Sequence, residues 1–227
     1  MKSSNFAAVV AAAGLTASSA MAATIINPIE FKEDDQAGFD LWPSEFAGSV
    51  STAEFVTPLT TSGMTTVTIT ASTTLGQALN RGSISDGTPP GFTYANLYRD
   101  LLIASSPTGF LTIDVDGLDA NQTYQFTLFA WDPGDSVDRD REWTVTGGTG
   151  VPTSNTLNWG TTALVDNNTF AMNFDITTDA GGAFQLTDTG ALQGSAINGF
   201  ILEQIPEPSA AVLAALAAIG LLARRRR

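Results

Sequence analysis

The sequence contains neither cysteine nor histidine. Without cysteine no disulfide can stabilise the chain, so its stability has to come from a hydrophobic core. The same two absences exclude a Ser-His-Asp or Cys-His catalytic site and a zinc ion held by histidine or cysteine. Hydrolysis by two carboxylates stays open, because a glycosidase needs only two Asp or Glu side chains across a cleft.

Basic residues are also scarce, with 10 Lys and Arg against 23 Asp and Glu. Half of the basic residues lie near the ends of the chain, so residues 23–204 keep five against 22 acidic residues, a formal charge of −17. A stretch of this charge does not neutralise phosphates and does not adhere electrostatically to anionic lipid. We therefore expect no nucleic-acid partner.

The first 22 residues have the pattern of a secretory signal peptide. Lys2 precedes an apolar run from Phe6 to Leu15, and the small residues of Ala20-Met21-Ala22 follow. This order of a basic end, an apolar segment and a small-x-small site predicts cleavage after Ala22. We expect the chain to be exported and leave residues 1–22 out of the folded domain.

The last residues combine three elements in a fixed order. Pro206-Glu207-Pro208 resists helix formation, because proline lacks an N–H and fixes its own φ, and Ser209 can then cap a helix. Residues 210–223 are almost purely aliphatic, and four arginines end the chain. A helix over 210–223 would reach roughly two thirds of the way across a ~30 Å hydrocarbon core. The arginines predict a cytoplasmic C-terminus, so that everything before Pro206 lies outside.

This tail resembles the PEP-CTERM protein-sorting signal, whose pattern is the tripeptide Pro206, Glu207 and Pro208, a short transmembrane helix and a basic end. The resemblance implies recognition by the secretion machinery and by an exosortase, an integral-membrane enzyme that cuts near the tripeptide. It also implies delivery to the cell surface or to an exopolysaccharide matrix. We expect the sorting tail to span residues 205–227. The alternatives are an ordinary short C-terminal anchor or a buried core helix.

Residues 23–204 have the texture of one all-β domain, in which short apolar alternations are separated by Gly, Asp, Asn and Pro. The clearest strands are Leu111–Val115, Tyr124–Trp131 and Phe170–Ile176. The second of these is apolar on both faces toward its end, which indicates a central strand. Weaker candidates are Ile25–Phe31, Thr66–Thr70, Leu97–Ile103, Trp143–Thr146, Ala183–Leu186 and Ile197–Glu203. We predict a single β-sandwich or jelly roll of about nine strands, plus the signal helix and the transmembrane helix.

A loop after the predicted central strand is rich in carboxylates. The acidic residues are Asp132, Asp135, Asp138, Asp140 and Glu142. Clustered carboxylate oxygens are the ligands that calcium prefers, and the first four residues are the candidate calcium ligands. The spacing does not match an EF-hand, and Arg139 and Arg141 lie among the acids, so a solvated acidic turn is the alternative. No other cofactor is expected.

Two tryptophans, Trp131 and Trp143, flank this acidic loop in the sequence. Flat aromatic rings at one end of a sandwich can stack on sugar rings, so both are candidate sugar-binding residues. Aromatic side chains in β proteins also pack in the core, and this alternative stays open for each of them.

Two further stretches carry looser resemblances. Residues 117–124, which include Leu118 and Tyr124, resemble the corner of fibronectin-type-III-like sandwiches, where a Leu packs inward and a Tyr hydroxyl caps backbone. Arg99-Asp100 and residues 198–202 resemble segments of galactose-binding-like and malectin-like modules. These resemblances imply a β-sandwich and transfer no ligand residue.

The sequence thus predicts an exported, non-catalytic protein of the cell surface or extracellular matrix, anchored at least transiently in the membrane, that contacts exopolysaccharide. Two alternatives from other classes remain, a carboxylate-based polysaccharide-degrading enzyme and a calcium-dependent adhesion module. An enzyme needs two facing carboxylates about 5 to 10 Å apart in a groove. A binding module needs only an exposed contact surface.

The arginine cluster yields a direct test of the predicted topology. Replacing Arg224, Arg225, Arg226 and Arg227 by neutral residues should release or mis-orient the chain, because the positive end no longer holds the C-terminus in the cytoplasm. Surface labelling and fractionation of producing cells measure this. Unchanged surface display would contradict the prediction.

Overall fold

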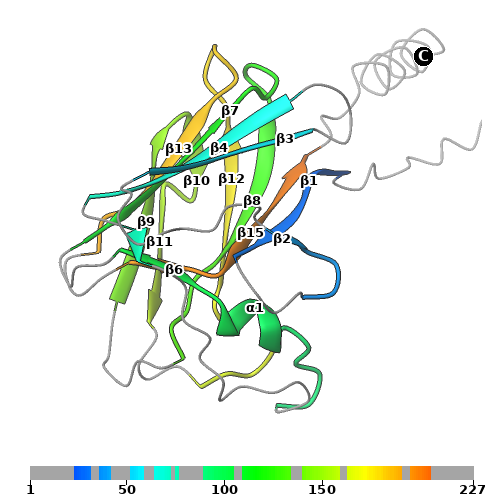
Figure 1. The fold of residues 1–227 in the computed structure, drawn as a ribbon. Coiled ribbons are helices and arrows are strands. Elements are labelled where there is room, and N and C mark those ends of the chain that lie inside the picture. The colour runs from blue at the N-terminus through cyan, green and yellow to red at the C-terminus, as the bar shows by residue number, and fades with distance from the viewer. Residues whose placement is uncertain are drawn as a thin grey trace, which may run out of the picture. The chain divides into compact units, whose positions relative to one another are not determined.

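Strands make up most of the described chain, and one short helix interrupts them (Figure 1). The computed structural model describes residues 23–31, 36–41, 52–58, 64–72, 75–76, 89–104, 109–133, 140–158, 163–190 and 195–205. All of them belong to one compact unit of the chain, Ala22–Ile205. The predicted signal peptide and the predicted sorting tail lie outside the described residues.

The elements are bounded as follows. In chain order they are β1 Ala23–Glu30, β2 Asp40–Leu41, β3 Thr52–Pro58, β4 Met64–Ala71, β5 Leu75–Gly76, α1 Ala95–Arg99, β6 Leu102–Ala104, β7 Leu111–Asp116, β8 Thr123–Phe129, β9 Asp140–Gly147, β10 Thr149–Val151, β11 Ser154–Asn158, β12 Ala171–Thr177, β13 Phe184–Asp188, β14 Ala196–Ile197 and β15 Gly199–Gln204.

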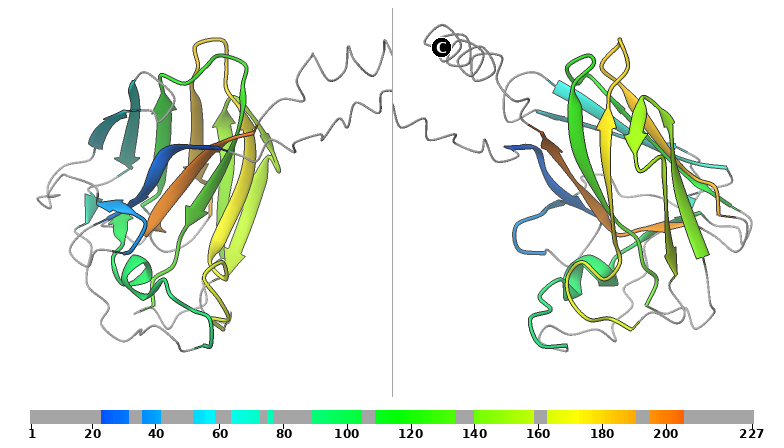
Figure 2. Two further views of the ribbon diagram at one scale, coloured as in Figure 1. Left: turned by 90° about the vertical axis from the view of Figure 1, so that its right-hand side faces the viewer. Right: turned by 180° about the vertical axis from the view of Figure 1, so that it is seen from behind.

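The strands form two six-stranded sheets and a small three-stranded one (Figure 2). The first sheet has the order β10-β12-β8-β15-β1-β2, and the second has the order β11-β9-β13-β7-β4-β3. The small sheet is β14-β6-β5. Strand β8 lies inside the first sheet, between β12 and β15, which confirms the expectation of a central strand there. The prediction of an all-β sandwich is confirmed.

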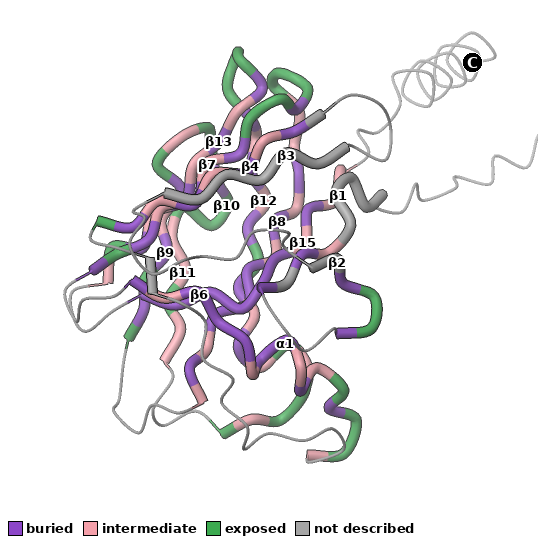
Figure 3. Tube along the Cα trace, in the orientation of Figure 1, coloured by how far each residue is buried: buried purple, intermediate pink, exposed green. Residues whose placement is uncertain are grey.

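Alternation along the strands places one face of each large sheet in a shared core (Figure 3). Strand β7 buries Leu111, Ile113 and Val115 and turns the residues between them outward. Strand β8 of the first sheet buries Phe126 and Leu128 in the same cluster. Because successive strand residues point to opposite faces, this pattern is what the apolar-polar alternation of the sequence predicts.

The predicted strand Leu97–Ile103 is wrong in its first half, because residues Ala95–Arg99 form helix α1 and the strand β6 begins only at Leu102. The helix is a single turn, closed by a hydrogen bond from Tyr98 N to Tyr94 O of 3.1 Å. One turn has no measurable helical period, so an apolar run of this length fits a strand and a helix equally well.

The predicted number of about nine strands is also too low, since the described residues contain β1 to β15. Strands β3 and β11 lie at the two edges of the second sheet, and several others are only two or three residues long. Edge strands such as Ser154–Asn158 carry mostly polar residues, so their sequence lacks the apolar alternation that identifies a strand.

The predicted corner before β8 is confirmed. Leu118 is buried, and the Asp119 N–H donates a hydrogen bond of 3.1 Å to the Tyr124 hydroxyl oxygen. Gly117 and Asn121 both have positive φ, 85° and 57°, which lets the chain turn sharply between β7 and β8. Burial raises the pKa of Tyr124 above its usual value. The start of β8 is therefore held in place by its own loop.

Removing this hydroxyl gives a test of the corner. Tyr124→Phe should lower the free energy of unfolding by about 0.5–1.5 kcal/mol, the net value of one such hydrogen bond. Urea unfolding of residues 23–205 measures it. The matched control is Tyr94→Phe, because the Tyr94 hydroxyl makes no hydrogen bond within the described part of the chain. Equal losses in both variants would contradict the corner's role.

Candidate functional site

Asn198 connects three segments at the end of the sandwich that carries α1. Its side chain is fully buried, and its Nδ2 donates to the carbonyl oxygens of Asp100 at 2.9 Å and Tyr98 at 3.4 Å. Its Oδ1 accepts a bond of 2.6 Å from Trp131 N. The two segments that resemble galactose-binding-like modules, Arg99-Asp100 and the one beginning at Asn198, are thus brought together here. Their joint role is to fix the end of β8 against α1.

Trp131 follows β8 and lies partly exposed at this end. Phe170 stacks on its ring at a centroid distance of 4.3 Å and an interplanar angle of 11°. Tyr98 meets the same ring edge-on at 5.6 Å, and burial raises the pKa of Tyr98. One face of the indole is therefore occupied by the protein itself, and a sugar ring can stack only on the opposite face. Sugar binding at Trp131 stays a prediction.

Trp143 does not share that surface. Its side chain is 0% exposed, because Arg141, Trp143 and Val145 of β9 all point into the core while Glu142 and Thr144 point outward. The core alternative therefore holds for Trp143, and the expectation that both tryptophans form one sugar-binding platform is wrong. The alternation of Trp143 and Val145 with the polar Glu142 and Thr144 is the sequence signal for this inward phase.

The acidic loop is only partly described. Asp132 is buried, and Asp140 is exposed and accepts a hydrogen bond of 2.7 Å from Asn158 Nδ2. Asp135 and Asp138 lie outside the described residues. Within the described ranges no group of three or more acidic side chains is placed to hold a metal ion. Calcium binding by this loop stays a prediction.

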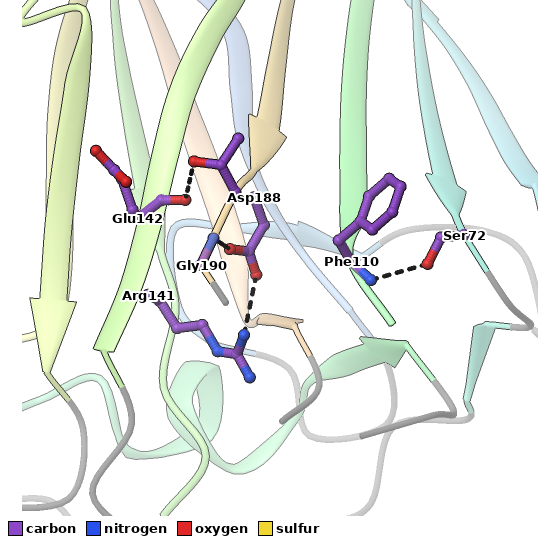
Figure 4. Close-up of polar contacts among 7 residues, drawn as sticks. Ser72, Phe110, Arg141, Glu142, Asp188 and Gly190 are labelled. Carbon is purple, nitrogen blue, oxygen red and sulfur yellow. Dashed lines mark hydrogen bonds and ion pairs between the residues drawn. The ribbon is translucent and has the colours of Figure 1, made fainter. Parts of the chain in front are cut away.

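A buried ion pair joins the ends of β9 and β13, as Figure 4 shows. Arg141 Nη1 lies 3.7 Å from Asp188 Oδ2, and both side chains are almost completely buried. Gly190 N donates a bond of 2.9 Å to Asp188 Oδ1. Burial raises the pKa of Asp188, and the charge of Arg141 and the hydrogen bond from the Gly190 N–H partly offset it.

This pair is not among the residues predicted from the sequence, although the sequence contains a signal for it. Arg141 and Asp188 occupy the inward phase of strands whose other inward residues, Trp143 and Leu186, are apolar. An inward charge at the end of each of two strands suggests a pair, but only the adjacency of β9 and β13 shows it. Because the Asp188 carboxyl is inaccessible to a polymer, the pair is structural.

The outward face of the second sheet has a uniform chemistry. Its described side chains on β4, β7, β13, β9 and β11 are hydroxyls, amides and carboxylates. The register of these strands aligns five hydroxyl residues across the sheet, and we call them the hydroxyl row. They are Thr70, Thr112, Thr187, Thr144 and Ser154. At a strand spacing of about 4.8 Å, the row is about 19 Å long.

Hydrogen bonds between neighbouring strands hold these side chains in fixed orientations. The Oγ1 atom of Thr187 lies 3.4 Å from that of Thr112 and 3.1 Å from that of Thr146. Gln185 accepts a bond of 2.7 Å from Thr146 and donates one to Asp114. A hydroxyl has one donor and two acceptor positions, so each retains capacity for a further partner. The surface is an ordered array of donors and acceptors.

Fold and surface define an all-β domain with an ordered polar face. Residues 204–227 match the PEP-CTERM protein-sorting motif, which confirms the resemblance of the tail. The motif implies an exported protein that an exosortase sorts in a membrane-associated step. No helix among the described residues meets the length and apolarity that membrane crossing demands, and the predicted helix over 210–223 lies outside them.

The chain also has distant likenesses among solved structures. The CBM22-1 xylan-binding domain from Paenibacillus barcinonensis Xyn10C is 13% identical, with a TM-score of 0.37 over 72% of this chain and 99% of that one. A ruminal GH26 endo-beta-1,4-mannanase is 16% identical, with a TM-score of 0.27 over 47% of this chain and 20% of that one. The enzymatically active domain of bacteriophage CBA120 tailspike protein 4 is 14% identical, with a TM-score of 0.29 over 76% and 23%.

With TM-scores of 0.37 or less, these likenesses carry no argument about function. The chain spans about a fifth of the second and third of these proteins. A comparison with curated protein sequences gives no match.

The buried pair generates a prediction about pH. Because the folded pKa of Asp188 is raised, its contribution to stability is fully present below the unfolded value of about 4 and is lost as pH rises through the folded pKa. The stability of the natural chain relative to Asp188→Asn should therefore increase as pH falls from 7 toward 4.5. Urea unfolding at both pH values measures the difference. If the stability of the natural chain relative to Asp188→Asn instead decreases as pH falls from 7 toward 4.5, pairing with Arg141 outweighs burial.

Proposed function

We propose that residues 23–205 form a non-catalytic module of the cell surface or extracellular matrix that contacts exopolysaccharide through the outward face of the second sheet. The sorting motif at 204–227 supports the location, because it is a signal for export and exosortase sorting. The hydroxyl row is the observation that carries the proposed contact. Its partner is an extended, neutral, polyhydroxylated polymer.

The chemistry of the face supports a polysaccharide partner. Each hydroxyl or amide that bonds a sugar hydroxyl contributes only about 0.5–1.5 kcal/mol, so a single contact is weak. A row that repeats at every strand offers several such contacts to one extended chain, and their effects combine through multivalency. Because neighbouring side chains already fix Thr187 and Thr146, little side-chain entropy is lost on binding.

The charge of the domain favours a neutral polymer over an anionic one. Asp114, Asp116 and Glu142 lie on the outward face, and the cationic side chains of the described residues are Arg99 and the buried Arg141. A uronate or sulfate chain would meet carboxylates of the same sign, which weakens binding. A neutral chain supplies hydroxyl donors to the same carboxylates.

Two observations support a non-catalytic role. The absence of histidine and cysteine removes the common nucleophile-base pairs. The Asp188 carboxyl has the raised pKa of a general acid, but it is 2% exposed and cannot reach a glycosidic oxygen. A turnover assay distinguishes this proposal from the alternative, a carboxylate-based polysaccharide-degrading enzyme.

A binding assay with a matched pair of variants tests the proposal. Immobilised neutral and anionic polysaccharides, including the extracellular polysaccharide of the producing organism, are exposed to residues 23–205. Thr187→Val removes the central hydroxyl of the row and keeps a β-branched shape, so binding to a neutral polymer should fall at least threefold. Thr127→Val is the control, because Thr127 lies on the outward face of the first sheet and donates to Asn173 at 2.7 Å.

The outcomes separate the classes. Binding that Thr187→Val weakens and Thr127→Val does not, without release of reducing ends, supports the proposal. Equal binding by all three proteins would move the contact away from the hydroxyl row. Release of reducing ends would favour the enzyme, and binding abolished by a chelator would favour the calcium-dependent adhesion module.

A further inference from the structure

The first and last strands of the domain are neighbours, and their ends coincide. Strands β1 and β15 are antiparallel, with Ala23 opposite Gln204 and Thr24 opposite Glu203. Ala23 is the first residue after the predicted signal cleavage, and Gln204 is the first residue of the matched sorting motif. The two processing signals are therefore attached at the same end of the first sheet, to neighbouring strands about one strand spacing of 4.8 Å apart.

The chain has almost no spacer between this end of the sheet and the sorting tripeptide. Strand β15 pairs with β8 up to Gln204 opposite Tyr124, and Ile205 N still donates to Thr123 O at 3.1 Å. Pro206 has no N–H, so the hydrogen-bonded ladder cannot continue beyond Ile205. The start of β8 is itself fixed by the Tyr124 corner. Pro206 is thus bonded directly to a residue that the folded domain holds in place.

We infer that signal removal and tail processing cannot take place at the same time, because both occur at this end of the first sheet. They occur in sequence, with the signal removed first. Gln204 and Pro206 are at most about 7 Å apart along an extended chain, so both processing sites lie close to Ala23 and Ile205. A protein interface of ordinary size covers about 800 Å² on each partner, a patch roughly 30 Å across. An enzyme bound at either site, or a signal segment that is still attached at Ala23, therefore obstructs access to the other site.

The order follows from the direction of synthesis and from the sheet. The N-terminus emerges before residue 204 exists, so its processing enzyme arrives first. Strand β15 lies between β1 and β8, so the first sheet is completed only when the last residues of the domain are available. Because Ala23 and Gln204 lie side by side at one end of the sheet, the domain can complete its folding while both flanking segments are still attached.

The test uses the full chain in its producing cell and rests on the predicted cleavage after Ala22, which the N-terminal sequence of the secreted chain checks. The double variant Ala20→Leu, Ala22→Leu blocks signal removal by replacing both small residues. A second chain carries the same block and a Gly/Ser linker of about 30 residues between Ile205 and Pro206, whose mean span is ~30 Å. The linker alone, in an otherwise natural chain, is the control.

Immunoblotting with antiserum against the domain measures the fraction of chains that have lost the tail. The blocked chain should lose its tail at least tenfold less than the natural chain. The linker should restore processing of the blocked chain to within twofold of the linker control, because it separates the two sites beyond one enzyme's contact patch. Protease resistance of the domain should be the same in all four chains.

Three results would overturn the inference. Normal tail processing with the signal retained would show that the sites do not exclude each other. A block that the linker does not relieve would show that the effect is not steric. Loss of protease resistance in the blocked chain would show that the domain does not close with both segments attached. None of these results depends on whether the outward face binds polysaccharide.

Discussion

The pairing of β15 with both β1 and β8 is the constraint on which the rest of the structure depends. The chain has no cysteine, so no disulfide joins the two ends of the domain, and among the described residues the pairing of Ala23 with Gln204 brings them together. Gly199 begins β15, and a Cβ there would collide with the Ile29 carbonyl and with Leu97. Glycine thus lets β1 and α1 approach β15 closely, and Asn198, one residue earlier, ties β8 and α1 to the same point. Losing this junction would open the first sheet at its centre.

Predictions from the sequence were correct where a few consecutive residues determine the local structure. The alternation of Leu111 to Val115 identified β7, and Leu118 with Tyr124 identified the corner, because both signals lie within a few consecutive residues. The prediction was wrong at α1, where a single helical turn has no period, and it missed edge strands such as β11, whose residues are mostly polar. The conformation of short and polar elements depends on the strands beside them, and the local sequence does not show which strands those are.

The candidate site shows the same limit more strongly. The hydroxyl row takes one residue from each of five strands, and alternation could identify those on β4, β7, β9 and β13 as outward-facing. The row itself exists only because β13 lies between β7 and β9, an order that no local pattern reveals. Trp143 illustrates the converse, since a residue that looked suited to sugar binding follows the inward phase of β9 into the core. The sorting motif was readable because its recognition depends on residue order and not on a fold.

The most direct test of the account is to locate the polysaccharide contact on the domain. Amide chemical-shift mapping by NMR of isotope-labelled residues 23–205, titrated with a soluble neutral polysaccharide, reports every perturbed position at once. The account predicts changes centred on the outward residues of β4, β7, β13 and β9, with Thr112 and Thr187 among the largest. Changes centred on Trp131 and α1, on the first sheet, or nowhere would contradict it.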